Sequence, residues 1–142
     1  MMSNRNILMT KEVYDQILDT IAVQPPETGG VLGRKNGIIC KYFYDDNADI
    51  NQHRYVPNVE KINTILDQWL KDDIEFAGII HSHQEDVNEL SYADIHYARK
   101  ILQENNLEYV IFPLVVRKTF NMYLIKSNSI YQCGISVIDK IC

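Results

Sequence analysis

Residues 76–105 constrain the fold of this chain more than any other segment, because an apolar strand is followed there by a helix. The apolar run at residues 76–80 has the length and composition of a buried strand. Residues 91–105 are typical of a helix that begins near Ser91. We therefore expect the end of the strand and the start of the helix to meet.

Side chains of the kind that bind zinc lie at both of these ends. Residues two apart on a strand point to the same face, so His81 and His83 converge while Ser82 faces away. Asp94 lies one turn into the expected helix, and its side chain points back toward the helix start. Two imidazoles and one carboxylate leave the fourth position of a tetrahedral zinc open, as catalytic sites do. The sequence therefore predicts a zinc site at His81, His83 and Asp94.

Each half of this pattern also has a purely structural explanation. A His-x-His pair at a strand end is often two polar side chains at the edge of a sheet. The Ser-x-x-Asp pair of Ser91 and Asp94 is a plausible helix cap without any metal. Capping and catalysis are compatible roles for Ser91.

The full spacing, His-Ser-His, seven residues, Ser, two residues and Asp, resembles the JAMM signature of the JAB/MPN family of zinc metalloproteases. An upstream Glu in that family commonly precedes a Gly-rich strand. Here Glu27 precedes residues 28–33, which read Thr-Gly-Gly-Val-Leu-Gly. The order of elements around both motifs is also similar to the family's core domain, so the resemblance covers most of the chain. Within the family, the chain resembles a small, stand-alone prokaryotic-type member.

The resemblance implies a role for each motif residue. One zinc per chain, bound by His81, His83 and Asp94, would lower the pKa of a water from near 16 toward roughly 7. Glu27 would accept the proton of that water and pass it to the leaving amine. Ser91 would help to stabilise the oxyanion, although the sequence by itself favours the capping role.

The remaining elements follow in an order that a mixed sheet with helices on both faces satisfies. Further helices are expected at residues 11–23 and 58–71, and further strands at residues 28–34, 38–44, 109–116, 120–126 and 129–137. Asn36-Gly37 predicts a tight hairpin turn. The resemblance implies a three-layer α/β/α arrangement similar to that of cytidine deaminases. No linker composition interrupts the sequence, so residues 1–142 are expected to form one domain.

Composition and charge exclude several classes of partner and site. The 14 basic and 19 acidic side chains give a net charge of −5, and the basic ones are scattered, so nucleic acid is not expected to bind. Neither a signal peptide nor a membrane span is evident, and we expect a cytoplasmic protein. The three cysteines predict neither a disulfide framework nor a thiolate zinc site. Cys40 and Cys133 are interpreted as small packed residues.

The resemblance also implies a class of substrate. The expected enzyme is an isopeptidase or peptidase that cleaves after the C-terminal tail of a ubiquitin-like or sulfur-carrier protein, with the tail bound as an extended strand. Residues 45–57 lie where family members commonly hold such a tail, although a solvated loop is favoured for most of them. A zinc hydrolase of small amides or free peptides would use the same residues. A non-catalytic scaffold of the same fold is the third hypothesis, and the complete ligand set argues against it.

Overall fold

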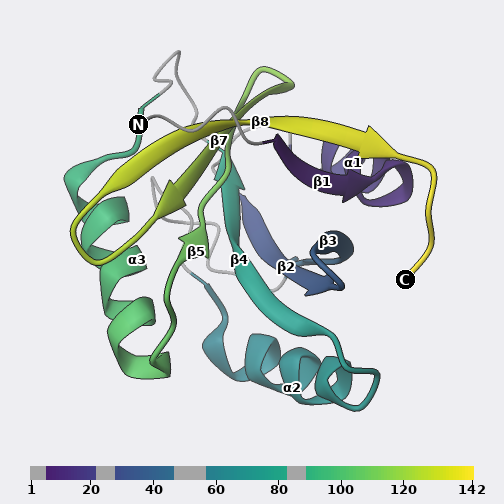
Figure 1. The fold of residues 1–142 in the computed structure, drawn as a ribbon, viewed down its shortest axis with the longest axis horizontal. Coiled ribbons are helices and arrows are strands. Elements are labelled where there is room, and N and C mark those ends of the chain that lie inside the picture. Colours follow the sequence, from purple (N-terminus) through teal and green to yellow (C-terminus); the bar gives the residue numbers. More distant parts are fainter. Residues whose placement is uncertain (1–5, 22–27, 47–56, 83–88) are drawn as a thin grey trace.

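The computed structural model of the chain describes residues 6–21, 28–46, 57–82 and 89–142 (Figure 1). The described residues form the helices α1 (Lys11–Thr20), α2 (Val59–Leu70) and α3 (Tyr92–Asn105). They also form the strands β1 (Asn6–Thr10), β2 (Gly29–Lys35), β3 (Ile38–Tyr44), β4 (Glu75–Ser82), β5 (Val110–Ile111), β6 (Leu114–Val116), β7 (Thr119–Ile125) and β8 (Ile130–Ile138). No helix in this part of the chain is both long and apolar enough to cross a membrane.

All of these strands belong to one mixed sheet with the order β2-β3-β1-β8-β7-β5-β4-β6. Strand β1 is parallel to β3 and β8, and β4 is parallel to β5 and β6. Strand β2 also pairs with β4, from Gly29 opposite His81 to Arg34 opposite Glu75. This pairing closes the sheet on itself, and β6 pairs with β7 as well. The mixed sheet was predicted, but three flat layers are not what forms, because strand twist accumulates until the sheet curls and closes.

The sheet carries a hydrophobic core on each face. Ile80 packs in a cluster with Val13 and Ile17 of α1. The preceding residue, Ile79, packs on the other face with Ile62 of α2 and Ala98 of α3. Alternation along a strand sends consecutive residues to opposite faces, so a strand buried on both faces reads as a continuous apolar run. The predicted placement of helices on both faces of the sheet is therefore confirmed.

Strand β1 was not predicted from the sequence, although it lies inside the sheet. Its Met9 is fully buried and pairs with Ile39 of β3 and Val137 of β8. Both partners lie far away in the sequence, so no local turn or alternation marked this short run as a strand. Thr10, at the end of β1, caps α1, because its hydroxyl oxygen accepts a hydrogen bond from the Val13 N–H (3.3 Å).

The strand predicted at residues 109–116 is divided into β5 and β6. Pro113 lies between the two short strands and has no N–H to donate to a neighbouring strand. Its carbonyl still accepts a hydrogen bond from the backbone N–H of His81 (3.2 Å). This hydrogen bond links the interrupted segment to β4, and β6 stays in register with the end of β4.

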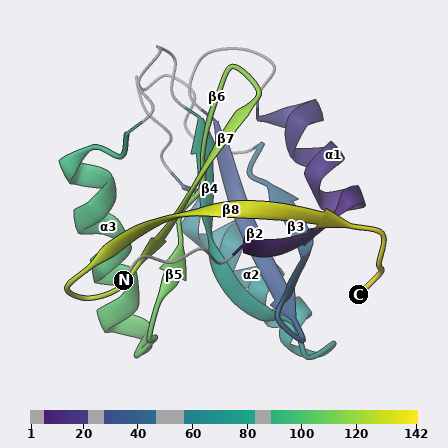
Figure 2. The same cartoon turned by 45° about the horizontal axis from the view of Figure 1, so that its top comes forward.

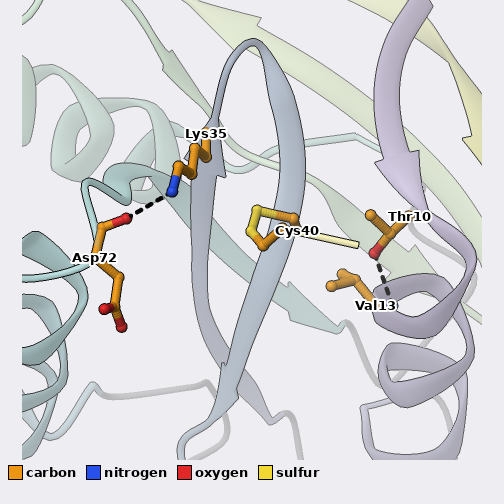
Figure 3. The surroundings of a disulfide bond; sticks show 6 residues. Thr10, Val13, Lys35, Cys40 and Asp72 are labelled. Atoms are coloured by element: carbon orange, nitrogen blue, oxygen red, sulfur yellow. Dashed lines mark hydrogen bonds between the residues drawn. A yellow bond between two sulfur atoms is a disulfide. The ribbon is translucent and has the colours of Figure 1, made fainter. Parts of the chain in front are cut away.

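A disulfide joins Cys40 in β3 to Cys142, and it corrects the interpretation of Cys40 as a packed thiol (Figure 3). The two Cα atoms are 5.5 Å apart, within the usual range for a disulfide, and 102 residues separate the cysteines in the sequence. An odd number of widely spaced cysteines gives no sequence signature for such a pairing. The bond fixes the end of the chain to β3, close to the start of α1 (Figure 3).

Candidate metal centre

His81 lies near the end of β4, between two neighbouring strands. Its Cα lies opposite Gly29 of β2 on one side and Leu114 of β6 on the other. Only 4% of the residue is exposed. Because the strand continues through Ser82, the predicted zinc strand is longer than the apolar run that revealed it. The backbone of His81 is therefore part of the rigid sheet.

Aromatic side chains fix the orientation of the His81 ring. The imidazole meets the buried ring of Phe112 edge to face, with ring centroids 5.4 Å apart and planes inclined by 61°. Phe112 in turn contacts the ring of Tyr97 on α3 at 6.4 Å and 68°. Such geometries are favourable for aromatic pairs. The imidazole thus lies on the face of the sheet that α3 covers.

Asp94 reaches the same place from the first turn of α3. Ser91 is the N-cap residue, and its hydroxyl oxygen accepts a hydrogen bond from the Asp94 N–H (3.0 Å). In return, the Ser91 N–H donates to Oδ2 of Asp94 (2.9 Å). This reciprocal capping box confirms the capping role predicted for Ser91. It also fixes the carboxylate, whose other oxygen, Oδ1, lies 3.3 Å from Nε2 of His81.

The separation of these two atoms fits a pair of ligands to one zinc. Tetrahedral zinc with Zn–N and Zn–O bonds of about 2.0–2.2 Å places neighbouring ligand atoms about 3.3–3.5 Å apart. The 3.3 Å between His81 Nε2 and Asp94 Oδ1 falls within this range, so the two atoms fit the spacing of two ligands to one ion. The Asp94 side chain is 20% exposed, which leaves an approach from solvent.

Two of the predicted site residues, Glu27 and His83, lie outside the described residues. The structure brings together His81, Asp94 and Ser91. Within residues 6–21, 28–46, 57–82 and 89–142, no group of three or more His, Cys, Asp or Glu side chains is placed to hold a metal. A complete zinc site therefore needs a further ligand, and His83 stays the predicted one.

Ser82, next to His81, makes a contact with Thr28 that the sequence did not reveal. Its side chain faces away from that of His81, as predicted, and the residue is 7% exposed. Its hydroxyl oxygen accepts a hydrogen bond from the Thr28 N–H (3.0 Å), and its own N–H donates to the Thr28 carbonyl (2.9 Å). Thr28 directly follows Glu27 in the sequence. The chain next to Glu27 is therefore fastened to the strand that carries His81.

Asp45 is a second residue that sequence reasoning missed, because it was interpreted as the start of a polar loop. It is 2% exposed, and its Oδ2 accepts a hydrogen bond from the Asn58 N–H (2.8 Å). The Asp45 N–H donates to the carbonyl of Gly29 (3.0 Å), the residue opposite His81. Asn58 caps α2. Asp45 thus connects the β2 backbone beside the candidate centre to the start of α2, and an acidic residue directly after a strand was the only sequence signal.

Comparisons with known proteins identify the family and the fold of the chain. Residues 10–127 match the family described as prokaryotic homologs of the JAB domain. No curated protein matches the sequence. Among solved structures, a protein from Desulfitobacterium hafniense is similar, with a TM-score of 0.74, 17% identity and 94% of each chain covered.

Two further structures share the fold at lower similarity. A JAB1/MPN domain protein from Archaeoglobus fulgidus has a TM-score of 0.59 and 12% identity over 94% of this chain and 98% of its own. The third structure is described as JAMM, a metalloprotease-like zinc site in the proteasome and signalosome. It has a TM-score of 0.56 and 12% identity over 95% of this chain and 100% of its own. At such low sequence identities, the structural similarity establishes a shared fold alone.

Proposed function

The chain belongs to the family of prokaryotic homologues of the JAB domain, and we propose that it is a zinc-dependent peptidase or isopeptidase. Its substrate would be the C-terminal tail of a ubiquitin-like or sulfur-carrier protein. The observation that carries this proposal is the 3.3 Å separation between His81 Nε2 and Asp94 Oδ1, two atoms fixed by independent parts of the fold. The zinc, the Glu base and the substrate class come from the JAMM resemblance.

His81, His83 and Asp94 would hold the zinc. When bound, zinc supplies the Lewis acidity that makes water a nucleophile near neutral pH. The protein's contribution at His81 and Asp94 is rigidity. The two neighbouring strands and Phe112 hold His81, and the capping box holds the carboxylate. Ligands fixed in advance lower the ordering cost of binding the ion.

Glu27 would move the proton from the attacking water to the leaving amine. The hydrogen bonds between Thr28 and Ser82 support this role, because they fasten the residue after Glu27 beside the end of β4. Ser91 would donate its O–H to the developing oxyanion. A hydroxyl that accepts one hydrogen bond still has its own hydrogen to donate. Its cap with Asp94 and its proposed catalytic role are therefore compatible.

The substrate tail would lie as an extended strand next to the centre, so that its main chain supplies most of the contacts. Small terminal residues, with Gly at the cleavage point, would fit a narrow approach. The protein would act in the cytoplasm. A disulfide between Cys40 and Cys142 would be unusual in a reducing compartment, and its presence in cells bears directly on that location.

The first test is the metal content of protein purified without added metal or a His tag. We expect about one zinc per chain in the wild type and in Glu27→Ala, and none in His81→Ala or Asp94→Ala. Glu27→Ala is the matched control, since it should keep the metal and the fold but lose most of the cleavage of ubiquitin-like conjugates. Zinc missing from the wild type, even after zinc is added back, would favour a scaffold. Cleavage of free peptides without any preference for such conjugates would favour a general zinc hydrolase.

A further inference from the structure

A chain of aromatic rings joins the two elements that carry His81 and Asp94. His81 lies in β4, and Asp94 lies in α3. The Phe112 ring meets the His81 imidazole, with centroids 5.4 Å apart and planes inclined by 61°. The same Phe112 ring meets the ring of Tyr97 at 6.4 Å and 68°. The contacts from His81 through Phe112 to Tyr97 therefore connect the strand that carries one predicted ligand to the helix that carries the other.

Tyr97 relates this chain of rings to Asp94. It lies three residues after Asp94 in α3, so the two side chains project from the same side of the helix. Tyr97 is half-buried and packs against the hydrophobic cluster that contains Phe112 and the buried Ala98. Figure 2 shows α3 alongside β5, the strand that ends directly before Phe112. Contact between the two rings therefore positions the first turns of α3, and with them Asp94.

The sheet fixes Phe112 relative to His81. The Phe112 N–H donates to a carbonyl of β7 (2.8 Å), and the carbonyl of the next residue, Pro113, accepts the His81 N–H (3.2 Å). Gly78 of β4 lies opposite Ile111 of β5, and a Cβ at Gly78 would collide with the Ile111 carbonyl. Phe112 itself is only 2% exposed. The backbone next to Phe112 is thus held closely against the strand that carries His81.

The rings are placed to control the separation of two ligand atoms. His81 Nε2 and Asp94 Oδ1 are 3.3 Å apart, and they come from elements that meet across Phe112 and Tyr97. A smaller side chain in place of Phe112 would leave a cavity beside the imidazole, and the surroundings relax only partly into such a space. The imidazole would then have more freedom to tilt, and α3 would lose a contact that fixes its position. Changes behind the ligands commonly alter metal affinity by about 10–100-fold.

We propose that Phe112 and Tyr97 are positioning residues of the metal centre, and that their contact sets the separation of His81 and Asp94 on which zinc affinity depends. This inference rests on the proposed function, which supplies the zinc. Neither residue touches the ion. Phe112 acts through the imidazole, and Tyr97 acts through the helix that carries the carboxylate.

The test measures zinc affinity of the whole chain by competition with a chromogenic chelator, so that it does not depend on catalysis. We expect Phe112→Leu and Tyr97→Leu each to raise the Kd for zinc about tenfold or more. Cobalt in place of zinc reports the ligand geometry, because Co²⁺ absorbs visible light strongly in tetrahedral sites and weakly in octahedral ones. Both variants should weaken or shift this absorption. Tyr97→Phe keeps the ring and should match the wild type in both measurements.

Phe120→Leu is the matched control, because it removes an aromatic contact on the other face of the sheet. Phe120 stacks on Tyr14 of α1, with ring centroids 5.0 Å apart, and packs against the cluster that contains Ile80. This variant should lower the melting temperature while leaving the zinc Kd and the cobalt spectrum unchanged. If Phe112→Leu does not fold, Tyr97→Leu provides the same test at a half-buried position.

Three outcomes separate this inference from the proposed function. Wild-type zinc affinity and cobalt spectra in the folded Leu variants at positions 97 and 112 would overturn the positioning role, and so would an equal loss of affinity in Phe120→Leu. A wild type that binds zinc but cleaves neither conjugates nor peptides would count against the proposed function alone. A wild type that binds no zinc would overturn both.

Discussion

Replacing Ser82 by Ala should destabilise the protein by an amount that the structure allows to be estimated. The Ser82 hydroxyl oxygen accepts the Thr28 N–H at 3.0 Å in a position that is 7% exposed. Removing it leaves a part-buried N–H without that acceptor, which costs about 1–3 kcal/mol. For a chain of this length each kcal/mol lowers the melting temperature by about 3–4 °C. We therefore expect a decrease of about 3–12 °C.

The same substitution should lower turnover more than metal binding. His81 keeps its strand pairings and its contact with Phe112, so the zinc content should stay near one per chain. Thr28 loses one of its two hydrogen bonds to Ser82 of β4. The proposed base, Glu27, directly precedes Thr28, so its position should become less well defined. Small displacements of catalytic groups are costly, so kcat should fall by about tenfold or more. The assays are thermal unfolding, elemental analysis and turnover of a conjugate at saturating substrate.

Ser82→Thr is the matched control for this prediction. Threonine keeps a hydroxyl on the same carbon, and its β-branched side chain suits a strand. It should melt within a few degrees of the wild type and retain most of kcat. Our reasoning would be refuted if Ser82→Ala melted within about 1 °C of the wild type, or if Ser82→Thr were destabilised as much as Ser82→Ala.

Asp45 and the disulfide between Cys40 and Cys142 give two further predictions about stability. Asp45→Ala should lower the free energy of unfolding by about 1.5–3 kcal/mol, because the Asn58 N–H loses a charged acceptor. Asp45→Asn keeps an acceptor oxygen and should cost less in chemical denaturation, and equal losses in the two variants would contradict this. Cys142→Ser should cost about 2–4 kcal/mol through loss of the cross-link to Cys40. Reductant should lower the wild-type melting temperature to that of the variant, and a wild type insensitive to reductant would show that the bond does not form in solution.

Local patterns were sufficient to predict the segment from β4 to α3. The apolar run at residues 76–80 needed no knowledge of its neighbours, because burial on both faces is visible in the composition. The helix start at Ser91 was equally visible, since a capping box is a local hydrogen-bond exchange. The turn at Asn36-Gly37 was predicted for the same kind of reason. These features depend on residues within a few positions of one another.

Features that depend on distant partners were not predicted. Strand β1 forms because Met9 finds Ile39 and Val137, and neither partner is marked by the residues around Met9. Closure of the sheet through β2 and β4 likewise depends on accumulated twist, which no short sequence pattern encodes. The hydrogen bond between Ser82 and Thr28 is a consequence of that closure. The sequence therefore predicted the strand and the helix that carry His81 and Asp94 better than the connections that hold these elements in place.

The geometry of Asp94 is compatible with both its capping role and its proposed role as a zinc ligand. Its Oδ2 completes the capping box with the Ser91 N–H, and its Oδ1 lies 3.3 Å from His81 Nε2. The cap needs one acceptor oxygen, which an amide also provides, so capping does not require a carboxylate. Only a carboxylate offers a second, equivalent anionic oxygen to a metal ion. Asp94→Asn should therefore keep α3 and its cap while losing zinc, and a variant that lost the helix as well as the metal would show that the two roles cannot be separated.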